Sequence, residues 1–192
     1  MSPAAMNFTA MNSGAAGDGG AAGDGGTAGD GGAAMASDPD YLVRPAAEDD
    51  IEALVSYEIE IAVVSFAAEA VTDPALHRRR IAGALGKAGE ITLVAAARRQ
   101  PGSPLGWAWL SGRTNSLTGE RYGNFRSLAV SDVPDRSRIA ELLMGAVLTA
   151  ADEHQMGQLT GKVHAGNLGM RALYRKFGFT ATHLTMERRA DS

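Results

Sequence analysis

The sequence has no cysteine, so disulfide bonds, zinc–thiolate sites and a cysteine nucleophile are excluded in this chain of 192 residues. It also has no run of 18 apolar residues, so we expect no membrane-spanning helix. No basic segment followed by an apolar segment opens the chain, and no secretory signal is therefore predicted. These absences favour a cytoplasmic protein without a membrane partner, and no set of residues predicts a metal site.

Large apolar side chains are missing from residues 14–34, where the hexamer Ala-Ala-Gly-Asp-Gly-Gly occurs twice and is followed by Thr-Ala-Gly-Asp-Gly-Gly. Burial of such small side chains cannot offset the entropy lost when the backbone is ordered. A calcium-binding repeat is disfavoured, because such repeats stack through interleaved large apolar residues. We therefore expect residues 1–39 to be a flexible low-complexity tail and residues 40–192 to form a single domain.

Charge is balanced within the expected domain. Residues 1–39 hold four Asp and no basic residue, and the 18 acidic residues that remain equal the 18 basic residues of the chain. A neutral domain is not built around nucleic-acid electrostatics, so no nucleic-acid partner is predicted. The longest basic run, Arg78-Arg79-Arg80, is more typical of a solvated helix face than of a binding patch.

Hydrophobic periodicity predicts strands and helices that follow one another along the chain. Asn167 is expected to be the N-cap of the last helix, and Gly178 is the residue type that ends a helix in the left-handed conformation. Strands are expected at 41–45, 91–97, 104–112, 124–130, 158–164 and 179–188, and helices at 51–64, 75–85, 138–153 and from 167 to 178. This order predicts an α+β domain with a mixed sheet.

The C-terminal third carries the most specific pattern. A strand ends in Phe125-Arg126-Ser127-Leu128-Ala129-Val130, a polar turn and an amphipathic helix follow, and the run from Asn167 to Phe179 has a Leu-Tyr pair before a final Gly-Phe. This arrangement resembles the closing signature of the GNAT superfamily of N-acetyltransferases, and the resemblance extends less sharply from Tyr41 to near the C-terminus. It implies a mostly antiparallel central sheet flanked by about four helices, and acetyl transfer from acetyl-CoA.

The loop expected to bind the CoA pyrophosphate departs from the superfamily pattern, which is Gln/Arg-x-x-Gly-x-Gly/Ala. The chain has Asp135-Arg136-Ser137-Arg138-Ile139-Ala140, in which the last Ala conforms and the first residue and central Gly do not. Glycine there would let the backbone approach phosphate closely. In one interpretation Arg136 and Arg138 bind the phosphates through their side chains. In the other the loop has lost its cofactor and both arginines are solvated.

The resemblance also implies roles for individual residues. Tyr174 corresponds to the tyrosine beside the cofactor sulfur that protonates the departing thiolate, and a phenol can hold its proton at neutral pH. The backbone of the strand corresponds to the donors for the acetyl carbonyl and the pantetheine arm. The predicted cofactor-binding residues are Leu128, Ala129, Val130, Arg136, Ser137, Arg138, Ile139, Ala140, Asn167 and Tyr174.

The general base is not defined by the sequence. An amine substrate is mostly protonated at neutral pH, so a group must accept its proton. Superfamily members often place a Glu on the strand equivalent to 122–130, and this chain has none there. Glu69 and Glu120 are the predicted candidates, Glu58 and Glu60 lie nearby in the sequence, and a relay of waters without a single base is the alternative.

Three functions remain open at this point. The leading hypothesis is an acetyl-CoA-dependent N-acetyltransferase that acts on a small-molecule amine by direct transfer within a ternary complex. A degenerate, non-catalytic binding or regulatory module would fit the altered pyrophosphate loop and the missing strand carboxylate. A protein acetyltransferase for lysines or N-termini ranks lower, because the neutral domain predicts no acidic groove. A homodimer is an open alternative for the oligomeric state.

Overall fold

The computed structural model describes residues 38–183. Its elements are β1 (Tyr41–Pro45), η1 (Glu48–Asp50), α1 (Ile51–Phe66), η2 (Ala67–Glu69), α2 (Pro74–Ala82), β2 (Glu90–Ala97), β3 (Pro104–Thr114), β4 (Arg121–Val130), α3 (Arg136–Glu153), β5 (Gln158–Thr160) and α4 (Leu168–Lys176). Across this part of the chain, no helix is both long and apolar enough to cross a membrane.

The five strands form one sheet in the order β1-β2-β3-β4-β5. The first three pairs are antiparallel, and only β4 and β5 run parallel. Successive antiparallel neighbours need only short connections, whereas the parallel pair requires a crossover, which α3 supplies. The predicted α+β fold with a mixed, mostly antiparallel sheet and four α-helices is therefore confirmed.

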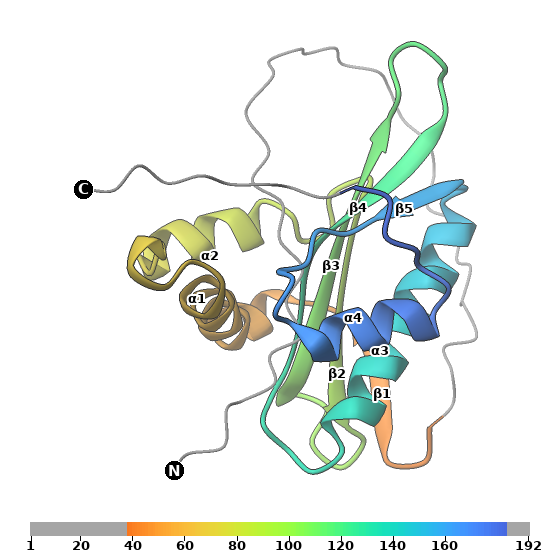
Figure 1. The fold of residues 1–192 in the computed structure, drawn as a ribbon. Coiled ribbons are helices and arrows are strands. Elements are labelled where there is room, and N and C mark those ends of the chain that lie inside the picture. The colour runs from red at the N-terminus through yellow and green to blue at the C-terminus, as the bar shows by residue number, and fades with distance from the viewer. Residues whose placement is uncertain (1–37, 184–192) are drawn as a thin grey trace.

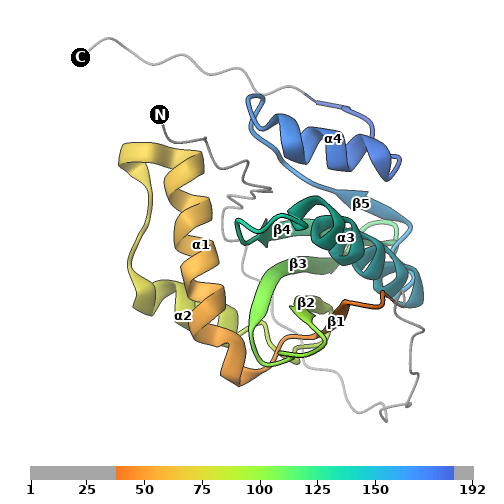
Figure 2. The same cartoon turned by 90° about the horizontal axis from the view of Figure 1, so that it is seen from below.

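Helices cover both faces of the sheet (Figures 1 and 2). Helices α1 and α2 lie on one face, and α3 and α4 lie on the other. Trp107 and Trp109 of β3 face α1 and α2, and Phe125 and Leu128 of β4 lie in the core beneath α3 and α4. Since both faces are covered, β2 is buried on both sides, which explains why residues 91–96 are all buried and why only Thr92 among them is polar.

The sequence placed most elements close to their observed positions, with differences at their ends. Helix α1 continues to Phe66 and η2 follows it, although the helix was expected to end at residue 64. Asp50 lies in the acidic turn η1 directly before α1, where it is 1% exposed and paired with Arg44 at 2.7 Å, and its carboxylate accepts a hydrogen bond from the backbone N–H of Ala47.

Both ends of the described part of the chain differ from the prediction. Residues 1–37 of the expected tail lie outside the described residues, whereas Asp38, within the expected tail, is described and contacts α3. Its carboxylate accepts hydrogen bonds from the backbone N–H groups of Asp40 and Tyr41 and from the guanidinium of Arg138. At the other end, the strand expected from Phe179 is absent over residues 179–183, and its remainder lies outside the described residues.

Candidate functional site

The strands β4 and β5 separate part-way along β4. Their register runs from Tyr122 opposite Gln158 to Asn124 opposite Thr160, where β5 ends. Strand β4 continues to Val130, so within residues 38–183 its outer edge has no paired strand beyond Asn124. A bulge in the β3–β4 register follows at once, because Trp109 and Leu110 lie opposite Ser127 and Phe125 and leave Arg126 as the extra residue. This edge offers backbone donors and acceptors to a ligand.

Tyr174 of α4 lies beside this separation. Its side chain is 6% exposed and its ring packs against Phe125 and Phe179, with ring centroids 5.9 Å and 4.8 Å away. The hydroxyl is buried and has no hydrogen-bond partner among the described residues. It lies so close to the backbone of Gly161 that a Cβ added there would overlap it. Burial raises the pKa of Tyr174 well above its usual range, so the phenol stays protonated.

Local capping fixes the helix that carries Tyr174. The Asn167 side-chain oxygen accepts a hydrogen bond of 3.0 Å from the backbone N–H of Met170, as expected for an N-cap. Gly178 has a φ of 81°, the left-handed conformation in which glycine ends a helix without strain. Both sequence predictions for this helix are confirmed. They hold Tyr174 two turns into α4 on its buried face.

The N-terminus of α3 has no side-chain cap. Asp135 is the N-cap residue, but its carboxylate accepts a hydrogen bond from the hydroxyl of Tyr41 instead of capping the helix. The first-turn N–H groups of a helix are the donors that bind phosphate in such loops. Ser137 is exposed in this turn, and Ile139 and Ala140 are fully buried beneath it. The residues of the predicted pyrophosphate loop therefore lie at an end of α3 that no side chain caps.

Arg138 is held by carboxylates from the start of the domain. Its Nε and Nη2 donate to the two carboxylate oxygens of Asp38 at 2.8 Å and 2.7 Å, and its Nη1 donates to Asp40 at 3.1 Å. The guanidinium carbon also lies 5.2 Å from the centre of the Tyr41 ring. Arg136 extends separately and donates to Asp132 at 3.3 Å. Phosphate would have to compete with Asp38 for the fork of Arg138.

The two predicted general bases are not brought to Tyr174 by any recorded contact. Glu120 is exposed in the β3–β4 hairpin, where its carboxylate accepts a hydrogen bond from the Thr118 hydroxyl. Glu69 is exposed at the end of η2. Both roles stay predictions.

Glu58 is the carboxylate that the sequence reasoning did not select. It lies on α1, faces the sheet and is 5% exposed, and its Oε1 has no hydrogen-bond partner among the described residues. Burial raises its pKa, against the opposing effects of the Ser127 hydroxyl and the charges of Arg80, His77 and Arg126. A signal was present in the sequence, since Glu58 falls on the same helical face as the apolar residues Leu54 and Ile61.

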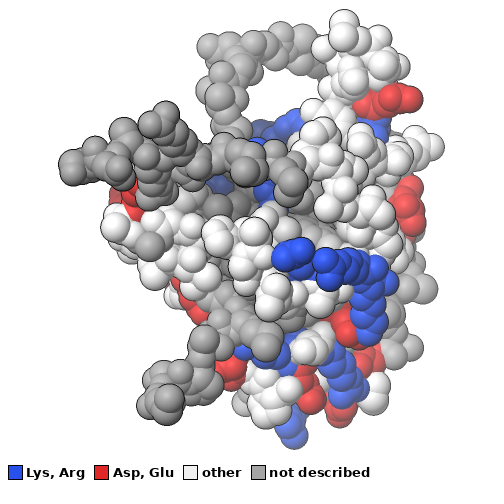
Figure 3. All heavy atoms as spheres, viewed as in Figure 1, with Lys and Arg blue, Asp and Glu red and all other residues white. Residues whose placement is uncertain are grey.

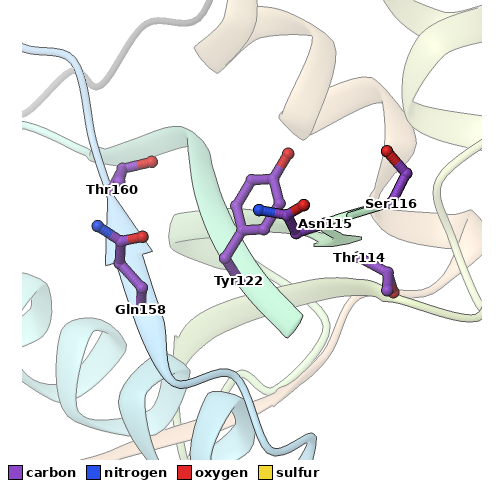
Figure 4. A pocket seen from close by; sticks show the side chains of 6 residues that line it. All are labelled: Thr114, Asn115, Ser116, Tyr122, Gln158 and Thr160. Atoms are coloured by element: carbon purple, nitrogen blue, oxygen red, sulfur yellow. The ribbon is translucent and has the colours of Figure 1, made fainter. Parts of the chain in front are cut away.

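A polar hollow of about 450 Å³ adjoins the paired part of β4 and β5 (Figure 4). Tyr122 stands between Gln158 and Thr160 of β5 and the β3–β4 hairpin residues, as Figure 4 shows. The residues that line the hollow are Thr114, Asn115, Ser116, Tyr122, Gln158 and Thr160. They offer neutral hydrogen-bonding groups and no charge. No group of three or more His, Cys, Asp or Glu within residues 38–183 is placed to hold a metal ion.

Basic side chains follow α4 on the face seen in Figure 3. Arg175 and Lys176 lie in the last turn of this helix, and Arg171 lies one turn earlier. Lys176 is paired with Glu141 of α3 at 2.5 Å, and Arg171 donates to the backbone oxygen of Ala165 at 2.9 Å. This side of the molecule therefore presents positive charge beside the α3–α4 surface.

A comparison with known families decides the identity of the fold. The sequence model of the Acetyltransferase (GNAT) family matches residues 53–179. The chain belongs to the GNAT acetyltransferase family. The predicted resemblance is thereby confirmed, and the match covers the separated strands, the uncapped end of α3 and the helix that carries Tyr174. A comparison with curated proteins found no match.

Solved structures with similar folds agree with this assignment. The chain is similar to a possible acetyltransferase from Clostridium difficile 630, with 12% identity, a TM-score of 0.63 and coverage of 80% of this chain and 99% of that chain. It is also similar to an acetyltransferase from Trypanosoma brucei, with 18% identity, a TM-score of 0.60 and coverage of 79% of this chain and 100% of that chain. At these identities the likeness shows the GNAT fold alone.

Three observations fit the acetyl-CoA that this family generally uses. The outer edge of β4 is unpaired beyond Asn124 within the described residues. The N-terminus of α3 has no side-chain cap. The Tyr174 hydroxyl is buried without a partner among residues 38–183, which is costly unless a ligand supplies one. The third observation is the most specific, because a phenol buried only for packing could be replaced by phenylalanine at no loss.

Proposed function

We propose that the protein is an N-acetyltransferase that transfers an acetyl group from acetyl-CoA directly to a small-molecule amine in a ternary complex. Acetyl-CoA supplies the activated thioester. The backbone of Leu128, Ala129 and Val130 would hold its pantetheine arm and carbonyl oxygen. The first turn of α3, with Ser137 and the side chain of Arg136, would hold the pyrophosphate. A cytoplasmic location and a single folded domain preceded by a flexible tail belong to the same proposal.

Tyr174 and Glu58 are assigned the proton transfers. The amine nitrogen forms a bond to the acetyl carbon, the carbon–sulfur bond breaks, and Tyr174 gives its proton to the departing thiolate. The proton lost by the amine goes to Glu58, either directly or through the Ser127 hydroxyl. A raised carboxyl pKa suits a general base, because the proton affinity of the carboxylate then lies closer to that of the amine that loses its proton. Glu69 and Glu120 remain alternatives that single substitutions would separate.

The observation that carries the proposal is the buried, partnerless hydroxyl of Tyr174 beside the point where β4 and β5 separate. A protonated phenol there is ready to donate to an atom bound between the strands. The raised pKa of Tyr174 supports an acid that keeps its proton until a strong base such as a thiolate forms.

The test measures CoA release and acetylated product for a panel of small amines and lysine-containing peptides. We expect small amines to be acetylated, and Tyr174→Phe to lower kcat by about 100- to 10,000-fold, the usual contribution of a positioned acid. Tyr41→Phe is the matched control for kcat at saturating acetyl-CoA, because it removes a hydroxyl of β1 that, within residues 38–183, binds Asp135. Full turnover by Tyr174→Phe at every pH would contradict the acid role. Acetylation of peptides alone would favour a protein acetyltransferase, and no product from any acceptor would favour the non-catalytic module.

A further inference from the structure

Two arginines gather around Trp109 on the α1/α2 face of the sheet. The guanidinium carbon of Arg80, from α2, lies 5.4 Å from the Trp109 ring centre, and that of Arg126, from β4, lies 5.7 Å from it. Trp109 is 5% exposed, and its ring nitrogen donates to Glu90 at 2.7 Å, which fixes the ring. Stacking on an aromatic face holds a guanidinium in place while leaving its N–H groups free to bind another group.

Arg80 and Arg126 form no ion pair within residues 38–183. All eight ion pairs present there join other residues. Glu90 accepts hydrogen bonds from Trp109, Ser111 and Arg113. Glu58 lies near enough for the charges of Arg80 and Arg126 to lower its pKa against the effect of burial, but its carboxylate forms no ion pair with either among the described residues.

Arg126 is the more informative of the two, because it is only partly exposed. Burial lowers its pKa, the positive charges of Arg80 and Arg113 add to this effect, and the charges of Glu90 and Glu58 oppose it. A partly buried cation beside other cations is unfavourable unless an anion joins it. The neighbouring positions of β4 are shielded from solvent, since Phe125 and Ser127 on either side of Arg126 are buried.

The cluster lies next to the proposed reaction site. Arg126 is the bulge residue of β4, two residues beyond the last β4–β5 pair. Its neighbour Phe125 packs against Tyr174 on one face of the sheet, while Arg126 contacts Trp109 on the other. A ligand that approaches the separated strands from the α1/α2 face therefore meets Arg126 opposite Tyr174.

We propose that Arg126 and Arg80 form an oxyanion-binding subsite for the acceptor, so that the preferred amine carries a carboxylate or phosphate group. The proposal rests on the proposed acetyl transfer for its biological meaning, but the anion site itself is a separate property. In this arrangement the anionic group binds the two guanidinium groups and the amino group lies toward Glu58 and the acetyl carbon. Guanidinium forks match both carboxylate and phosphate oxygens.

The binding test uses the fluorescence of Trp107 and Trp109 at constant ionic strength. Inorganic phosphate and acetate are titrated separately, to distinguish the two anion sources. A saturable change is expected with at least one anion, and Arg126→Gln should weaken its binding by about 10- to 100-fold, the loss expected for a charge-assisted bond. Arg79→Gln is the matched control, since it removes a neighbouring charge of α2. No saturable change with either anion, or equal weakening by the two variants, would overturn the proposal.

The kinetic test compares amines that differ only in the anionic group. Glycine is paired with glycinamide, and O-phosphoethanolamine with ethanolamine, with acetyl-CoA saturating. We expect higher kcat/KM for the anionic member of at least one pair, and Arg126→Gln should reduce that preference about 10- to 100-fold through KM. Acetylation of neutral and anionic members with equal efficiency would overturn the anionic preference while leaving the acetyltransferase proposal intact. Saturable anion binding without acetylation of any amine would support the subsite and contradict the proposed function.

Discussion

At the scale of single residues, the position of the Tyr174 hydroxyl depends on a glycine that the sequence analysis did not select. Gly161 follows β5 and has no side chain where the hydroxyl lies. Its φ is not in the left-handed region, so alanine is compatible with the backbone and the only conflict is with the phenol. A substitution at Gly161 therefore displaces the hydroxyl, whereas Tyr174→Phe removes it.

We expect Gly161→Ala to lower kcat by at least about tenfold, because displacing a positioned acid weakens proton transfer. Gly157→Ala is the control, since a Cβ there meets no atom within 4 Å. Steady-state kinetics and thermal unfolding of both variants would be measured together. If the two variants had the same kcat, the close approach at Gly161 would have no catalytic meaning.

The buried Glu58 carboxylate is predicted to lower the stability of the folded chain and to contribute to activity. Its pKa in the folded chain is raised by burial, so the stability that depends on a neutral carboxyl is complete below the usual pKa of Glu and is lost as pH rises through the raised pKa. Glu58→Gln removes this loss. We expect its Tm to exceed that of the wild type by a few degrees at pH 8, with the difference shrinking toward pH 4.

The same substitution should lower kcat by about 100- to 10,000-fold if Glu58 accepts the amine proton. The wild-type kcat should also fall as pH drops through the raised pKa of Glu58, and this acid limb should be absent in the variant. Glu69→Gln and Glu120→Gln serve as comparisons. A variant at Glu58 with wild-type activity, beside an inactive variant at Glu69 or Glu120, would return the role of base to the residues predicted from the sequence.

At the scale of elements, Arg138 joins the start of β1 to the start of α3. Two neighbouring loops meet there, and the fork of Arg138 is filled by Asp38. Against the effect of desolvation, hydrogen bonds from Asp40, Tyr41 and Arg138 hold the pKa of Asp38 below its usual value. A lowered pKa contributes stability above the unfolded-state pKa, and this contribution disappears as pH falls through the folded-state value.

We expect Asp38→Asn to lower Tm at pH 7 and to match the wild type in strongly acidic solution, below the ordinary Asp pKa of 3.8. Thermal unfolding across this pH range provides the measurement. A constant difference in Tm at all pH values would show that the carboxylate charge is not what links the two elements.

Arg138→Ala tests the anchoring role against the phosphate-clamp prediction. Because its donors are occupied by Asp38 and Asp40, we expect the acetyl-CoA Kd to change by less than about threefold while Tm falls. Arg136→Ala is the companion variant and should weaken binding more. A large rise in Kd for Arg138→Ala alone would favour the side-chain clamp.

The elements also show what the sequence could and could not determine. Apolar periodicity and caps placed all four α-helices and β1 to β5, because each depends on neighbouring residues. The length of β5 was overestimated, since strand pairing is a tertiary property and ends at Thr160. Tyr174 was selected through its motif. Glu58 was not selected, although its place on an apolar helical face was a signal, and Gly161 was not, because its close approach to Tyr174 arises only when the segment after β5 packs against α4.

At the scale of the whole molecule, the boundary of the folded unit is predicted to lie before Asp38. We expect a chain that begins at Met35 to keep the Tm and acetyl-CoA Kd of the full chain. A chain that begins at Tyr41 lacks Asp38 and Asp40 and should lose stability, because Arg138 then has neither of these partners. Equal Tm values for the two truncated chains would contradict this boundary.

The central claim is that the separated strands, the uncapped α3 and the Tyr174 hydroxyl together form an acetyl-CoA site. Isothermal titration calorimetry of acetyl-CoA into the full chain tests it most directly. The account predicts binding at one site per chain with a Kd in the micromolar range, about −8 kcal/mol. Absence of binding by a chain that still unfolds cooperatively would contradict the account and favour a GNAT domain without its cofactor.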